Sequence, residues 1–177
     1  HKSALGSSYT QKGRSGFRGK GSCLLHRKGE KQMQPLELYI HIPFCVKKCA
    51  YCDFLSGPAG EKEKEEYVKM LVDEIRNCPD TVQNYRVISI FFGGGTPSLL
   101  TGEQIGLLMD TVREIFTLDE DAEITMEMNP GTVTEEKLRK YRQAGVNRLS
   151  IGLQSVNDEE LRLLGRIHTY EEFREAY

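Results

Sequence analysis

The sequence lacks any apolar run near the roughly 20 residues that a membrane-spanning helix needs, so we expect no membrane span. It also lacks a large excess of charge, because 24 Lys and Arg oppose 26 Asp and Glu and leave a formal net charge of −2. Global charge therefore predicts neither nucleic acid nor an anionic membrane as a partner. The 177 residues are enough to bury the core of one ordinary domain.

The charge is divided unevenly along the chain. Residues 1–36 carry eight Lys and Arg against one acidic residue, Glu30, whereas 37–177 carry 16 basic and 25 acidic residues. The first segment is rich in Gly and Ser and has no period of 2 or 3.6 residues, so it cannot bury enough apolar surface to fold. We expect a disordered basic tail over 1–36, either a leader or the end of an upstream region. A nucleic-acid-binding arm is the alternative.

From residue 37 onward, β-rich and helical patterns alternate. Short apolar or β-branched runs predict strands at 38–44, 86–92, 122–128 and 148–153. Apolar residues at helical spacing, with capping residues before them, predict helices at 61–77, 102–116 and 134–144, and shorter ones after Asn157 and Thr169. Four β-then-α units predict a parallel α/β sheet with right-handed crossovers. Such sheets place their chemistry at the carboxyl ends of the strands.

Three cysteines follow the first strand directly: Cys45, Cys49 and Cys52. Zinc would require a fourth ligand, and no second ligand pair follows, while His41 precedes the loop inside the strand. Three clustered thiols cannot pair completely as disulfides. A cubane iron–sulfur cluster suits three thiolates, because its fourth iron can stay open for another ligand. We assign no role to the two remaining cysteines, Cys23 and Cys78.

The Cys-x3-Cys-x2-Cys spacing resembles that of the radical S-adenosylmethionine (SAM) superfamily. The longer string around it is similar to the oxygen-independent coproporphyrinogen III oxidase-like group, which includes a heme chaperone. The resemblance covers about 38–177, and it is strongest in four strings at 38–54, 92–97, 127–130 and 148–155. It implies a partial (β/α)6 barrel in which 37–177 supply the first four β/α units. On this interpretation the chain is a fragment that lacks the C-terminal part of the protein.

The resemblance also implies a [4Fe-4S] cluster on the three cysteines and a SAM site beside it. By themselves the residues leave other interpretations open. The glycine-rich turn fits neither the Walker nor the Rossmann spacing and could be a simple strand–helix turn, Glu127 could be a structural carboxylate, and Arg166 could be a helix C-terminal cation. The SAM contacts that the resemblance implies are Tyr39, Tyr51, Gly94, Gly95, Thr96, Glu127, Gln154 and Arg166.

One departure from the oxidase pattern bears on function. The oxidase has a fourth cysteine two residues after the third, whereas this chain has Phe54. The resemblance therefore favours a heme chaperone that binds heme and transfers it to apoproteins. A coproporphyrinogen oxidase-type enzyme that cleaves SAM reductively is one alternative, and a non-catalytic metal-binding domain is another.

The resemblance also implies partners and a location. The cluster requires an electron donor such as flavodoxin or ferredoxin, and Lys47 and Lys48 could attract an acidic donor or be simply solvated. Heme or another tetrapyrrole and a heme-accepting apoprotein are the other expected partners. Histidines His41 and His168 are expected to be structural. We expect a cytoplasmic protein.

Overall fold

The computed structural model describes residues 33–177, and the predicted tail lies outside the described residues except at its end. There the prediction is wrong, because strand β1 (Gln34–Ile42) begins four residues earlier than expected. Leu36 pairs with Val87 of the neighbouring strand and packs against the hydrophobic core. The pairing partner is 51 positions away along the chain, so local composition gave no sign of it.

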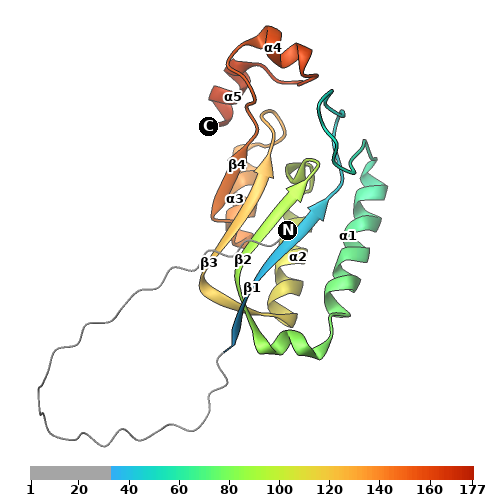
Figure 1. Cartoon of the computed structure of the whole chain (residues 1–177), viewed down its shortest axis with the longest axis vertical. Coiled ribbons are helices and arrows are strands. Elements are labelled where there is room, and N and C mark those ends of the chain that lie inside the picture. The colour runs from blue at the N-terminus through green and yellow to red at the C-terminus, as the bar shows by residue number, and fades with distance from the viewer. Residues whose placement is uncertain (1–32) are drawn as a thin grey trace, which may run out of the picture. The chain divides into compact units, whose positions relative to one another are not determined.

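The described elements follow the predicted β-then-α order (Figure 1). The other strands are β2 (Tyr85–Gly94), β3 (Thr117–Met128) and β4 (Arg148–Ile151). The helices are α1 (Glu61–Arg76), α2 (Gly102–Ile115), α3 (Glu135–Ala144), α4 (Asp158–Leu163) and α5 (Tyr170–Ala176), with 3-10 turns η1 (Asp80–Asn84) and η2 (Pro97–Leu99). The four strands form one sheet in the order β1-β2-β3-β4, and each neighbouring pair is parallel. The predicted parallel α/β sheet is confirmed.

The core lies between one face of the sheet and helices α1, α2 and α3, which cover that face in Figure 1. Alternate strand residues point into it, among them Ile40, Ile90 and Met126, and all three are buried. Helix α2 contributes the predicted stripe, in which Ile105 and Leu108 are fully buried. Burial of these side chains fixes which face of each strand is turned toward the helices.

The opposite face of the sheet carries a different set of residues. Tyr39, Phe91 and Thr125 lie side by side there, because their positions pair across β1, β2 and β3. The helices α4 and α5 lie beyond the carboxyl ends of the strands (Figure 1). None of the described helices is long and apolar enough to cross a membrane.

Helix starts agree closely with the capping pattern of the sequence. Thr101 and Gln104 form a reciprocal capping box at the start of α2, and the Thr134 side chain caps α3. Gly145, with φ of 112°, ends α3 in the left-handed conformation that glycine adopts without strain. At the strands the bounds differ more. Strand β4 ends at Ile151, two residues earlier than predicted.

Candidate functional site

A pocket of about 440 Å³ lies where the strands end. The loop after β1, the turn after β2, the end of β3 and the segment after β4 all contribute to its wall. Ten of the eleven residues predicted for the cluster and SAM sites line it. They are Cys45, Cys49, Tyr51, Cys52, Gly94, Gly95, Thr96, Glu127, Gln154 and Arg166.

The three cysteines of the loop are unpaired thiols that all line this pocket. Backbone hydrogen bonds hold the loop at two points: the Cys45 amide donates to the Gly57 carbonyl at 2.9 Å, and the Ala50 amide donates to the Leu164 carbonyl at 3.0 Å. Within residues 33–177, no three His, Cys, Asp or Glu side chains are close enough together to hold a single metal ion. The donor set, three thiols around one cavity, nevertheless suits an iron–sulfur cluster, which is wider than one ion.

The glycine-rich turn approaches the cysteine loop very closely. A Cβ on Gly95 would lie 2.5 Å from the Phe44 carbonyl oxygen and 3.0 Å from Cys45 Sγ. Gly94 has a φ of 115°, and a Cβ there would lie 2.6 Å from the His41 ring. Only residues without a Cβ allow this approach. The turn therefore packs directly against the backbone and the sulfur at the start of the cysteine loop.

Glu127 is half-buried near the end of β3, on the pocket side of the strand. Its Oε2 accepts a hydrogen bond from the Gly94 amide at 3.2 Å. Burial raises the pKa of this carboxyl group above its ordinary value, and the Gly94 hydrogen bond partly opposes that rise. A carboxylate that bears such a desolvation cost inside a pocket is suited to a cationic or hydroxyl-bearing ligand.

Arg166 follows α4 and reaches across the pocket to the cysteine loop. Its Nη1 donates to Cys49 Sγ at 3.6 Å, and its Nη2 donates to the Gly152 carbonyl at 2.8 Å. Its Nε is buried and has no partner. An arginine held by strand-end acceptors, with one buried donor unused, is arranged to receive an anionic group such as a carboxylate.

Of three further predicted SAM contacts, two line the pocket and one does not. Gln154 lies three residues beyond β4, with a φ of 74°, instead of ending the strand as predicted. Tyr51 lies at the pocket wall, where burial raises the pKa of its hydroxyl and Arg166 partly opposes that rise. Tyr39 does not line the pocket. It is 58% exposed and stacks on Phe91 on the open face of the sheet.

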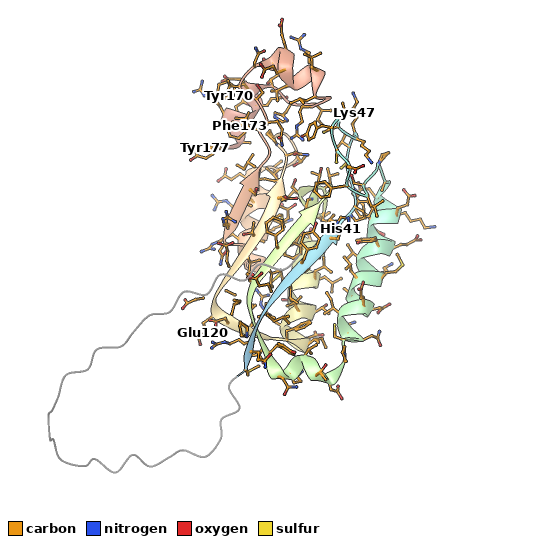
Figure 2. The ribbon with its side chains drawn as sticks, viewed as in Figure 1. His41, Lys47, Glu120, Tyr170, Phe173 and Tyr177 are labelled. Carbon is orange, nitrogen blue, oxygen red and sulfur yellow. The ribbon has the colours of Figure 1, made fainter. Side chains whose placement is uncertain are left out.

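The two histidines and the loop lysines lie as follows. His168 is buried, its Nε2 is 3.2 Å from the Leu153 carbonyl, and burial lowers its pKa. His41 lies near the end of β1 and contacts the Tyr39 hydroxyl at 3.2 Å, whereas Lys47 lies in the loop beyond it (Figure 2). Lys47 is exposed and lines the pocket, and Lys48 donates to the Phe54 carbonyl at 3.2 Å.

Sequence reasoning missed one pocket residue with several polar contacts, Asn129. It contacts both Arg166 and Thr96 through its side-chain amide. The signal was present, since Asn129 belongs to the 127–130 string. Only the tertiary structure brings it next to residues that lie 33 and 37 positions away along the chain.

Comparison with known proteins agrees with this geometry. The radical SAM superfamily matches residues 39–177. The heme chaperone HemW of Escherichia coli strain K12 is 50% identical over 146 residues, which is 82% of this chain and 39% of that protein. The mouse protein "radical S-adenosyl methionine domain-containing protein 1, mitochondrial" is 42% identical over 132 residues, or 75% of this chain and 30% of that one.

A solved structure of a radical SAM enzyme also resembles this chain. Coproporphyrinogen III oxidase (HemN) from Escherichia coli, described as a radical SAM enzyme, matches with a TM-score of 0.74 and 36% identity. That match covers 80% of this chain and 33% of the oxidase. The chain thus spans less than half the length of these relatives. Fold, motif strings and sequence similarity agree, and the chain belongs to the radical SAM superfamily, in its HemN/HemW-like group.

Proposed function

We propose that this chain forms the cluster- and SAM-binding part of a heme chaperone. The observation that carries the proposal is the pocket at the strand ends, which the cysteine loop, the glycine turn, Glu127 and Arg166 all line. A structural zinc site or a simple metal-binding domain would have no use for that additional polar shell. The non-catalytic alternative is therefore disfavoured.

Each residue has a specific task in this proposal. Cys45, Cys49 and Cys52 hold the [4Fe-4S] cluster, which supplies one electron to SAM when both are bound. Glu127 attracts the amino group of SAM, and Arg166 binds its carboxylate. The glycine turn at Gly95 packs close against the cysteine loop, and this leaves room in the pocket for the ligand. The chain's contribution is thus to position and orient the two cofactors.

The choice of a chaperone over an oxidase depends on Phe54 and on the relatives. Phe54 is 60% exposed at the pocket wall, where the oxidase pattern has a fourth cysteine. The curated relatives named as heme chaperones include one with 50% identity, whereas the oxidase matches at 36%. A coproporphyrinogen oxidase-type activity remains the second candidate, because the oxidase fold matches over 80% of this chain.

The decisive experiment uses the full-length protein, reconstituted with iron and sulfide in the absence of oxygen. We expect four irons per chain, a spectral change on adding SAM, tight heme binding and no conversion of coproporphyrinogen III. Conversion of that porphyrinogen would support the oxidase instead. Cys49→Ala should abolish the cluster, whereas Cys78→Ala should retain it, because Cys78 packs against the hydrophobic core, donates to the Glu74 carbonyl of α1 and does not line the pocket. Retention of four irons by Cys49→Ala would overturn the cluster assignment.

The expected partners are part of the same proposal. A flavodoxin or ferredoxin would reduce the cluster, and a heme-requiring apoprotein would receive the heme. Exposed Lys47 in the cysteine loop could guide an acidic donor, so Lys47→Glu should slow cluster reduction by flavodoxin more at low than at high salt. A cytoplasmic location is also proposed, and imaging of the full-length tagged protein would test it against a mitochondrial location.

A further inference from the structure

Asn129 occupies the centre of a hydrogen-bonded chain that connects two of the three cysteines. Its Oδ1 accepts from Arg166 Nη2 at 2.6 Å, and its Nδ2 donates to Thr96 Oγ1 at 3.0 Å. Arg166 Nη1 in turn donates to Cys49 Sγ at 3.6 Å, and Thr96 Oγ1 donates to Cys45 Sγ at 3.8 Å. One side-chain amide thus contacts both polar groups that reach the sulfurs of Cys45 and Cys49.

The direction of every bond in this chain follows from the chemistry of the groups. A guanidinium has only donors, so the Asn129 oxygen must face Arg166 and the nitrogen must face Thr96. The Thr96 hydroxyl accepts that bond with a lone pair, which leaves its single proton available for Cys45. The amide therefore determines not only where the Arg166 side chain lies but also where the Thr96 proton points.

The Asn129 backbone is itself fixed, so its side chain starts from a rigid position. The backbone N–H of Asn129 donates to Ser98 Oγ at 3.4 Å, and the backbone carbonyl of Asn129 accepts from Thr132 Oγ1 at 2.6 Å. The next residue is buried Pro130, whose ring restricts the chain further. A side chain held in this way loses little entropy when it binds two partners.

We propose that Asn129 is a positioning residue for the cluster and SAM site. It holds the Arg166 guanidinium in place for an incoming carboxylate, and it directs hydrogen bonds onto Cys45 and Cys49. Hydrogen bonds to cluster sulfurs raise the reduction potential of an iron–sulfur centre. Loss of Asn129 should therefore weaken SAM binding and lower the potential. This inference rests on the proposed function, because it presumes a cluster on these thiols.

Two variants separate the two contacts of the amide. Asn129→Ala removes both and should weaken SAM binding at least about tenfold, or roughly 1.4 kcal/mol, and lower the potential. Asn129→Asp retains the acceptor for Arg166 but draws the Thr96 proton away from Cys45. It should therefore retain SAM affinity within about threefold, or roughly 0.65 kcal/mol, while the potential still falls.

The matched control is Asn147→Ala. Asn147 also makes two side-chain hydrogen bonds, one to the Ile124 amide and one to the Ala122 carbonyl, each 2.8 Å long, but it does not line the pocket. The Asn147→Ala variant should be less stable than the wild type but should have the same SAM affinity and the same cluster reduction potential.

The test uses full-length protein, anaerobic titration of SAM, iron analysis and redox titration followed by electron paramagnetic resonance. A wild-type protein that takes up no iron would overturn the proposed function and this inference with it. If the wild type binds cluster and SAM, unchanged affinity and potential in Asn129→Ala would overturn the inference alone. If Asn129→Ala does not fold, Asn129→Asp decides, because an unchanged potential in that variant would equally contradict the role of Asn129.

Discussion

Glu127 and Gly94 join the ends of two neighbouring strands through one hydrogen bond, in which the Gly94 amide donates to Glu127 Oε2 at 3.2 Å. Gly94 ends β2, and Glu127 is the penultimate residue of β3. The contact holds the carboxylate at the pocket wall and leaves its other oxygen for a ligand.

We predict that Glu127→Gln will weaken SAM binding about tenfold, or roughly 1.4 kcal/mol. The amide oxygen of Gln can still accept from Gly94, but the negative charge that attracts an ammonium group is lost. Calorimetric titration of the reconstituted protein would measure the effect. Glu123→Gln is the matched control, since Glu123 lies on the same face of β3 and pairs with Arg148 outside the pocket. Equal losses in the two variants would argue against a specific role for Glu127.

The raised pKa of Glu127 makes a separate prediction about stability. The folded protein binds the Glu127 proton more tightly than the unfolded chain does. Ionisation of this carboxyl group therefore lowers the free energy of unfolding as the pH rises above 4.5, the ordinary pKa of the group. Glu127→Gln should therefore raise the melting temperature of the metal-free protein at neutral pH. The gain should shrink as the pH falls toward 4.5. Thermal unfolding at several pH values would check this, and a gain that grows at lower pH would contradict it.

The close approach of Gly95 to the cysteine loop predicts a strong effect of one methyl group. In Gly95→Ala the new Cβ would collide with the Phe44 carbonyl and Cys45 Sγ, so the loop must shift. We expect incomplete iron uptake during reconstitution. Gly106→Ala is the control, because a Cβ there meets nothing within 4 Å in the middle of α2. It should retain full iron content and stabilise the fold by about 0.5–1 kcal/mol. Full iron uptake by Gly95→Ala would show that cluster assembly does not depend on the close approach of Gly95 to the cysteine loop.

Tyr141 supports the segment between the glycine turn and α2. Its buried hydroxyl donates to the Leu100 carbonyl at 2.6 Å and lies 3.2 Å from the Ser98 carbonyl, and burial raises its pKa. Tyr141→Phe leaves both carbonyls without this donor and should cost about 1–3 kcal/mol of unfolding free energy. Urea denaturation would measure it. A loss below about 0.3 kcal/mol would mean that other donors replace the hydroxyl.

The elements of this fold were predictable from the sequence wherever a local signal was strong. The buried stripe and capping box gave α2 almost to the residue, and the apolar run of β2 was equally clear. The start of β1 was wrong because residues 34–36 carry no strand pattern of their own, and they become a strand only by pairing with β2. The early start of β3 at Thr117 has the same cause, since Thr117 and Leu118 pair with Arg86 and Val87.

The candidate site, like the fold, was predictable where local signals sufficed and unpredictable where distant segments meet. Spacing alone pointed to Cys45, Cys49 and Cys52, and alternation along β3 placed Glu127 on the face opposite Met126. Spacing could not show that Tyr39 lies outside the pocket, nor that Asn129 has two polar partners. Those facts depend on where four strand ends and the segment after α4 meet.

By itself, then, the sequence determined the order of strands and helices, the parallel sheet and the cysteine loop, because periodicity, capping and motif spacing act over a few residues. Tertiary structure alone decided the hydrogen-bonded chain through Asn129 and the contact between Arg166 and Cys49, which are 117 positions apart. Such contacts form only when the parallel sheet brings the carboxyl ends of its strands together. The physical reason is that a hydrogen bond is short and directional, so no pattern along the chain encodes its partner.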